Sequence, residues 1–285
     1  MKIILSRKGF DSSSGGCPSP IYEDGSILSL PIAHSKASTQ YADIQARGGS
    51  IGRVVEDLTR QRMKRGRYMQ ATDRAHLDPD LRRESLARKP GWRPLFGQVD
   101  AAQGHLDKHC VGVGDLFLFF GWFRGVQRRD GRYSFVRGAP DLHVLFGWLE
   151  IGDVWRGGSQ PCRAPAWAAR HPHVAGCPGH ANTIYVASEG DPPHGGGVFP
   201  RFHPDLVLTA PGMSRGRWRL PGWFHPTDGR SALSFHSNPS RWSRHGQHAY
   251  LQTVGRGQEF VLDADGYPEA VPWARGLITA HGRPA

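Results

Sequence analysis

The sequence predicts an α+β fold: residues 1–285 form a strand-rich single domain around a central antiparallel or barrel-like sheet, with a few short helices. The chain has 285 residues, of which 38% are hydrophobic, so it can bury a core and wholesale disorder is excluded. Its 37 Gly and 22 Pro indicate many turns and short elements, which argues against a helix bundle. Apolar runs of strand length dominate the middle of the chain.

The first third of the chain predicts a strand, a hairpin and three helices. Lys2–Ser6 is an apolar strand that leads into a Gly/Ser loop, and Asp24-Gly25 is typical of a hairpin turn. From an N-cap at Ser50, apolar residues recur at helical spacing until Gly66. Further short helices are expected at 80–88 and 98–108.

The rest of the chain predicts strands separated by loops. Residues 115–124 and 142–151 are dense in Phe, Leu and Trp and share the tripeptide FGW, so we expect them to be adjacent strands. Shorter strands are expected at 133–136, 183–187, 206–209, 232–235 and 259–262. The segments 155–181 and 188–204 have little regular pattern, as functional loops often do.

The charge of the chain favours a polyanionic partner. Lys and Arg number 36 against 25 Asp and Glu, a formal net charge of +11. Residues 47–93 hold 13 basic and six acidic side chains, hence +7 of that charge, so a basic helical subregion at 47–110 is expected within the domain. However, 30 of the basic residues are Arg, and a GC-rich genome produces the same skew without any nucleic-acid partner.

Compartment and membrane association follow from what the sequence lacks. The longest apolar stretch, around Leu116–Phe123, is too short to span a bilayer, and no signal peptide is recognisable. The four cysteines form no CxxC pair and are too few for a disulfide framework. We therefore expect a cytoplasmic protein with no membrane partner.

The loop after the first strand is a candidate phosphate or sugar site. In SRKGFDSSSGG, Ser6, Arg7, Lys8 and Ser12 offer hydroxyls and cations beside flexible backbone amides. Asp11 is a candidate catalytic base or ribose ligand. The loop does not match the P-loop pattern, which argues against a standard NTPase, and a solvated turn is the alternative.

The segment HLDPD is the second candidate site. His76 and Asp78 are suited to proton transfer, or to binding a hard cation. The alternative is a helix entry in which Asp78 or Asp80 caps the helix expected at 80–88.

Two polar groups are candidate substrate-binding residues. Gln98 and Gln103 can read a base edge and His105 can carry a proton, although a short surface helix would show the same residues. Gln258 and Glu259 open a predicted strand and could present a carboxylate at its edge, or simply face solvent.

Metal and cofactor requirements are open from the sequence. Five residues of ligand type lie within 19 positions: Cys162, His171, His173, Cys177 and His180. These types suit zinc, but the spacing matches no standard finger and the chain has 15 His in all.

Taken together, several segments resemble the third family of nucleotide-modification-associated domains, known from bacterial and phage genomes. They are SRKGFDSSSGGCPSPI, DGSILSLPI, HLDPDL, GQVDAAQGHLDKH, GVGDLFLFFGWFR, LHVLFGWLEIG, NTIYVAS and GRGQEFVLD, which span nearly the whole chain. The resemblance implies a place in gene neighbourhoods that modify nucleobases in DNA or their nucleotide precursors, with neighbouring modification enzymes as partners.

Three functions follow as hypotheses. The first is an enzyme that carries out transfer chemistry on a nucleotide or DNA base. The second is a non-catalytic β-barrel-type reader of modified bases, in which Trp122 and Trp148 would be stacking walls unless they are core. The third is a metal-dependent nuclease or other restriction component.

Overall fold

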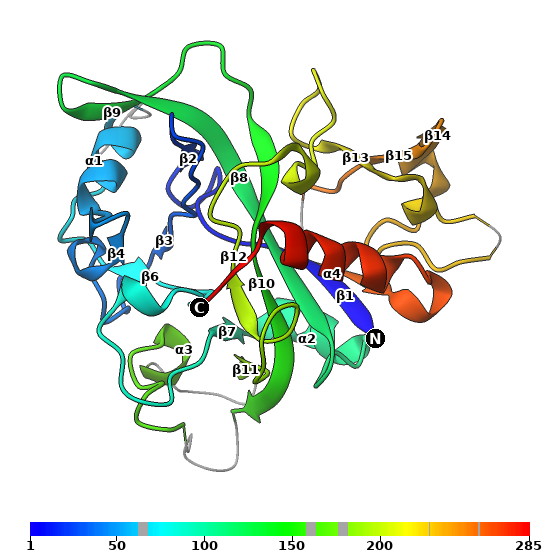
Figure 1. Cartoon of the computed structure of the whole chain (residues 1–285), viewed down its shortest axis with the longest axis horizontal. Coiled ribbons are helices and arrows are strands. Elements are labelled where there is room, and N and C mark those ends of the chain that lie inside the picture. Colours follow the sequence, from blue (N-terminus) through cyan, green and yellow to red (C-terminus); the bar gives the residue numbers. More distant parts are fainter. Residues whose placement is uncertain (62–67, 158–163, 176–181, 228, 256) are drawn as a thin grey trace.

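Two long antiparallel strands form the centre of the molecule. The computed structural model describes residues 1–61, 68–157, 164–175, 182–227, 229–255 and 257–285. Strands β8 (Leu116–Arg129) and β10 (Leu142–Arg156) cross the whole molecule side by side (Figure 1). Gly121 of β8 pairs with Val144 of β10, which brings the two FGW segments together as predicted.

The main sheet is mixed and open. Its order is β16–β1–β8–β10–β11–β7, where β1 pairs with β8 in parallel and the other neighbours are antiparallel. The strands that complete this path are β16 (Glu259–Asp263), β1 (Lys2–Arg7), β11 (Thr183–Ala187) and β7 (Leu95–Gln98). Four short strands join it at the side: β2 (Ser19–Ile21), β9 (Arg132–Phe135), β12 (Gly196–Val198) and β17 (Arg283–Pro284). The α+β prediction is confirmed, and the sheet does not close into a barrel among the described residues.

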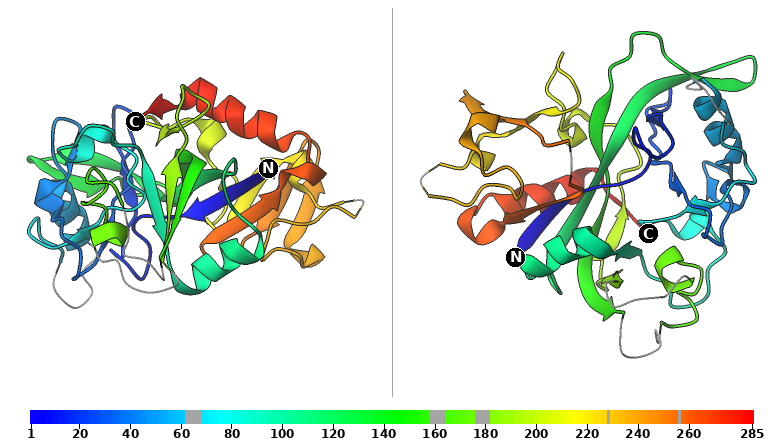
Figure 2. Two further views of the ribbon diagram at one scale, coloured as in Figure 1. Left: turned by 90° about the horizontal axis from the view of Figure 1, so that it is seen from below. Right: turned by 180° about the vertical axis from the view of Figure 1, so that it is seen from behind.

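Smaller sheets and helices flank this centre. The small sheets are β13 (Arg217–Pro221), β15 (His248–Gln252) and β14 (Trp242–His245); β3 (Ile32–Ala33) and β6 (Ala75–His76); and β4 (Gln45–Ala46) and β5 (Gly49–Ser50). The helices are α1 (Gly52–Arg60), α2 (Asp100–Lys108), α3 (Pro172–Ala175) and α4 (Ala270–His281). The α1 region and the β13–β15 sheet lie on opposite sides of the β8–β10 pair (Figure 2). No helix among the described residues has the length and apolar character needed to cross a membrane.

Three predicted elements are wrong. The segment 80–88 contains only a 3-10 turn, Arg83–Ser85, because the backbone of Asp80 pairs with Leu95 and is held extended. Residues 206–209 form isolated bridges in place of a strand. Residues 232–235 are not a strand either, and Phe235 has a φ of 65°, which is incompatible with extended backbone.

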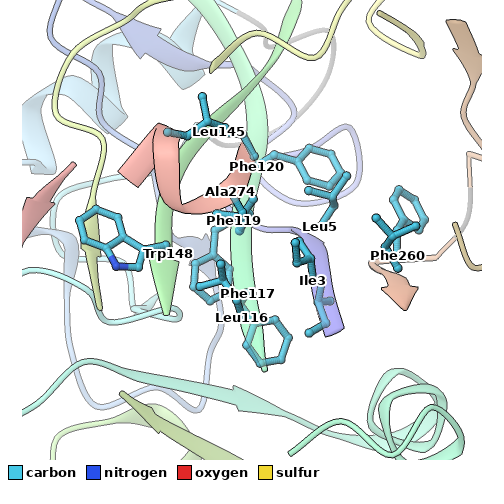
Figure 3. Close-up of a cluster of buried hydrophobic side chains, with 14 of the residues drawn as sticks. Ile3, Leu5, Leu116, Phe117, Phe119, Phe120, Leu145, Trp148, Phe260 and Ala274 are labelled. Atoms are coloured by element: carbon cyan, nitrogen blue, oxygen red, sulfur yellow. The ribbon is translucent and has the colours of Figure 1, made fainter. Parts of the chain in front are cut away.

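The core lies between the main sheet and the elements that cover it. Ile3 and Leu5 of β1 share one face of the sheet with Leu116 of β8, whereas Phe117 and Phe119 of β8 point to the other face. All five belong to one buried cluster, which Ala274 of α4 joins (Figure 3). Each buried apolar side chain of this size stabilises the fold by about 2 kcal/mol relative to exposure.

The two tryptophans that the reader hypothesis placed in a binding pocket belong to the interior. Trp148 is fully buried in the main core, and Trp122 is also buried. Neither ring is exposed for stacking on a base.

The basic stretch does not pack as one unit. Helix α1 buries Val54, Val55 and Leu58 against side chains from residues 10–44. In contrast, β7 is a strand of the main sheet, and α2 packs on the core of that sheet. The predicted end of this helix at Gly66 lies outside the described residues. The single-domain organisation stays a prediction.

Candidate active site

A cavity of about 630 Å³ opens beside the carboxyl end of β1. Ends of β1, β7 and β16, the beginning of α2, His76 of β6 and His173 of α3 surround it. It brings together ten residues that the sequence analysis selected from separate segments: Arg7, Lys8, Asp11, His76, Asp78, Gln98, His105, His173, Gln258 and Glu259. Its volume is within the usual range for small-molecule sites.

The Gly/Ser loop builds one rim of the cavity through its own hydrogen bonds. Asp11 Oδ1 accepts hydrogen bonds from the amides of Ser13 (2.8 Å) and Ser14 (2.6 Å) and from the Ser13 hydroxyl. These two amides are therefore engaged within the loop by the Asp11 side chain. Ser12 is exposed and Ser6 is fully buried, and neither lines the cavity.

A buried ion pair forms part of the cavity wall. Lys8 Nζ lies 2.7 Å from Glu259 Oε1, and Gln98 Nε2 donates to the same oxygen at 2.7 Å. Lys8 also donates to Gln258 Oε1 at 3.4 Å. The carboxylate is only 1% exposed, and its Oε2 has no hydrogen-bond partner among the described residues.

Arg7 adds a second cation to this wall. Its Nη2 donates to the carbonyls of Gly255 and Gly257. Burial lowers the pKa of Arg7, with nearby Asp11 opposing that effect. These contacts fix the guanidinium beside the cavity.

Two rings stack at the mouth of the cavity. His105 of α2 lies with its centroid 4.2 Å from that of Phe235, the planes 25° apart. Phe235 is 47% exposed, and its positive φ is a strained conformation for a phenylalanine. Gln103 points elsewhere: it is buried and bonded to Asp107 and Tyr185, so it does not line the cavity.

Three ligand-type side chains converge on the third wall. His76 Nε2 lies 3.2 Å from His173 Nε2, and Asp78 Oδ2 lies 3.8 Å and 3.6 Å from these two nitrogens. All three residues line the cavity, and their ligand atoms are close enough to hold one metal ion.

Neighbouring groups fix the orientation of Asp78 and His173. Asp78 Oδ1 accepts hydrogen bonds from the amide of Gly97 (2.9 Å) and from His171 Nε2 (3.2 Å). Asn182 Oδ1 lies 2.8 Å from His173 Nδ1. Asp78 and His173 are therefore each held from behind by a second group, as metal ligands commonly are, whereas the buried Nδ1 of His76 has no hydrogen-bond partner among the described residues.

Charge states in the trio follow from burial and mutual contact. Burial lowers the pKa of His76 to about 4, and it also lowers the pKa of His173, in both cases against the attraction of Asp78. For Asp78, burial alone would raise the pKa, but the hydrogen bond from His171 and the adjacent imidazoles hold it well below its ordinary value. At neutral pH the trio is two neutral imidazoles and one carboxylate.

Several predicted candidates are elsewhere. Cys162, Cys177 and His180 lie outside the described residues. Asp80 is not a helix cap: its two oxygens are bound by Arg88 at 2.7 Å and 2.5 Å. In the basic stretch, Arg47 pairs with Asp24 and Arg93 with Glu189, so part of its charge is neutralised locally.

Sequence reasoning missed four residues that shape the site. His34 and Phe235 line the cavity, Gly97 supports Asp78, and Asn182 supports His173. A signal existed for two of them, because Gly97 is next to Gln98 and Asn182 opens the NTIYVAS segment. His34 and Phe235 have no distinguishing pattern in the sequence.

Comparison with known proteins adds one match. The model of the family described as nucleotide modification associated domain 3 matches residues 2–263. No curated protein and no solved structure matches the chain.

Proposed function

We propose that this chain, which belongs to the nucleotide modification associated domain 3 family, is an enzyme that modifies a nucleotide or a DNA base in the cavity described above. The family match includes every residue that lines the cavity. It supports a role in nucleotide modification, and the arrangement of the cavity supports the more specific proposal.

The observation that carries the proposal is the unpartnered oxygen of Glu259. A buried carboxylate oxygen without a donor costs about 1–3 kcal/mol or more, so a ligand that donates to it gains affinity. Ring N–H and exocyclic amino groups of nucleobases are such donors. Lys8 and Gln98 hold the other oxygen and so orient Oε2.

Other features of the cavity suit the rest of a nucleotide. The exposed face of Phe235, backed by His105, offers a surface on which a base can stack. Arg7 supplies positive charge for a phosphate group.

Catalysis, beyond binding, is supported by the trio of His76, Asp78 and His173, which lines the same cavity as Glu259. A binding pocket for a base does not require two imidazoles and a carboxylate on its wall. In this proposal the neutral imidazoles and the ionised Asp78 supply the lone pairs for acid–base or metal-ion catalysis on the substrate. The reaction class is transfer chemistry at a base or sugar, the class that the sequence analysis favoured.

The test is nucleoside mass spectrometry on cells that express the protein. DNA and the free nucleotide pool are digested separately from cells with wild type, Glu259→Gln and Glu189→Gln. Glu189 is the matched control because its side chain is 85% exposed. We expect a new nucleoside mass with wild type and Glu189→Gln, reduced at least tenfold by Glu259→Gln.

Two results would contradict the enzyme. Binding of a modified base without any new mass would support the reader, and metal-dependent loss of DNA would support the nuclease. Equal amounts of the new nucleoside from wild type and Glu259→Gln would show that Glu259 takes no part in substrate binding or catalysis.

A further inference from the structure

We propose that His76, Asp78 and His173 bind one divalent transition-metal ion through two imidazole nitrogens and one carboxylate oxygen. The site is a wall of the cavity to which the proposed function is assigned, and in that respect the inference deepens that function. Binding of the ion, however, can be measured whether or not the reaction is known.

The separations of the three ligand atoms fit a single ion. A point equidistant from atoms 3.2, 3.6 and 3.8 Å apart lies about 2.1 Å from each, which is the usual metal–nitrogen and metal–oxygen distance. At that distance the two nitrogens subtend an angle of about 100° at the ion. Only small side-chain shifts are needed for a regular geometry.

Hydrogen bonds set His173 as a metal ligand. Asn182 Nδ2 donates to the carbonyl of His173 at 2.8 Å, so its Oδ1 is the atom that faces His173 Nδ1. His173 Nδ1 must then carry the proton and donate it, which leaves a lone pair on Nε2 pointing into the trio. This is the tautomer that coordinates metal ions through Nε2.

Asp78 and His76 complete the set. Oδ1 of Asp78 already accepts from Gly97 and His171, whereas Oδ2 faces the two ligand nitrogens. Because His173 Nε2 has a lone pair, His76 Nε2, which lies 3.2 Å away, donates a hydrogen bond to it when no ion is bound. A cation between the rings would replace that proton.

The donor set selects the class of ion. Imidazole nitrogens favour Fe²⁺, Co²⁺ and Zn²⁺ over Mg²⁺ and Ca²⁺, which prefer oxygen ligands. Since three protein ligands face a cavity, the ion would keep positions for water or substrate, which is the arrangement of catalytic sites.

A second trio provides an internal control. His203, Asp205 and His281 offer the same donor types at the surface. There the two imidazole rings stack on each other, 4.2 Å between centroids, and His203 Nδ1 accepts from the amide of Asp205. Among the described residues, no group outside this trio forms a hydrogen bond to its side chains, whereas Asp78 and His173 of the cavity have such partners, so we expect the surface trio to bind ions weakly.

The experiment is a titration of the full chain, stripped with a chelator, with Co²⁺, Zn²⁺ and Mg²⁺. Calorimetry gives affinity and stoichiometry, and the absorption of the Co²⁺ protein reports the ligand type. We expect one Co²⁺ or Zn²⁺ per chain, no comparable Mg²⁺ binding, and a spectrum without thiolate charge transfer. Asp78→Asn and His173→Ala should weaken binding at least 100-fold, while His281→Ala leaves it unchanged.

Several outcomes would overturn the site. Unchanged Co²⁺ affinity in Asp78→Asn and His173→Ala is one such outcome, and loss of Co²⁺ binding in His281→Ala is another. The third is a thiolate charge-transfer band in the Co²⁺ spectrum that disappears in the double variant Cys162→Ser/Cys177→Ser. If the cavity variants fail to fold by circular dichroism, proton NMR of the wild-type Co²⁺ protein decides: two shifted imidazole N–H signals support the site, and none contradicts it. Ion binding without a modified nucleoside would refute the proposed function and leave the metal site intact. A modified nucleoside formed by a protein that binds no ion would refute the metal site and leave the proposed function intact.

Discussion

Asn182 contacts His173 twice, once at the backbone carbonyl and once at ring nitrogen Nδ1, both at 2.8 Å. Because the first contact fixes which amide atom faces the ring, the second determines the tautomer of His173. A residue outside the cavity lining thus sets the chemistry of a residue within it.

Loss of this contact should weaken ion binding without removing a ligand. Asn182→Ala is expected to lower Co²⁺ affinity by about 10- to 100-fold, the usual effect of deleting a group that orients a metal ligand. Asn238→Ala, which removes a surface cap on Ser240, should leave the affinity unchanged. Calorimetry measures both variants, and equal affinities would show that Asn182 does not position His173.

Gly97 should tolerate no side chain. A Cβ there would lie 2.2 Å from Cγ of His173, so Gly97→Ala must displace the ring. We expect weaker Co²⁺ binding and a lower free energy of unfolding. Gly104→Ala is the control: nothing lies within 4 Å of its Cβ position in helix α2, and it should raise the unfolding free energy by about 0.5–1 kcal/mol. Identical behaviour of the two variants in urea unfolding and Co²⁺ titration would contradict this packing.

The Lys8–Glu259 pair should depend on both partners. Lys8→Met leaves a buried carboxylate without its cation and is expected to cost about 3–5 kcal/mol in urea unfolding. The double variant Lys8→Met/Glu259→Gln removes both charges and should recover most of that loss. A double variant no more stable than Lys8→Met would show that the charges are not energetically coupled.

Stability should fall in acid because of buried neutral histidines. His143 accepts a hydrogen bond from Trp218 Nε1, and burial, with Arg215 and Arg7 nearby, lowers its pKa to about 3. The unfolded chain binds a proton at His143 below about pH 6.5 whereas the folded chain does not. The stability that depends on a neutral His143 is therefore fully present above pH 6.5. It is lost as the pH falls from 6.5 towards 3, when the free energy of unfolding decreases by about 1.4 kcal/mol per pH unit.

Unfolding curves between pH 8 and pH 4 measure this effect. His143→Gln should flatten the pH dependence over that range, whereas replacement of the exposed His245 by Gln should not. A wild-type stability that is constant from pH 7 to pH 4.5 would contradict the assignment.

Much of the fold could be predicted from the sequence because its central strands are long and rich in apolar residues. The FGW strands and the 183–187 strand carry enough apolar residues to define their conformation locally. The 80–88 segment could not be predicted, since its conformation depends on the backbone pairing of Asp80 with Leu95 and on Arg88. Such pairing has no local signal.

For the candidate site, individual residues could be predicted from the sequence, but their arrangement in space could not. Lys8 after the first predicted strand, Gln98 at the start of a predicted helix and Glu259 at the start of a predicted strand could be selected individually. Their meeting in one cavity depends on the order of strands in the sheet. His76 and His173, 97 positions apart, were placed in separate hypotheses, because the sequence gives no distance between the loops that bring them together.

Binding of nucleotides to the purified protein tests the central claim most directly. A panel of ribo- and deoxyribonucleoside monophosphates, with a short DNA duplex and single strand, is titrated by calorimetry into wild type, Glu259→Gln and Glu189→Gln. We predict that at least one of them binds at one per chain, at least tenfold more weakly to Glu259→Gln and equally to Glu189→Gln. Absence of binding by every member of the panel, or equal binding to wild type and Glu259→Gln, would contradict a nucleobase site at Glu259.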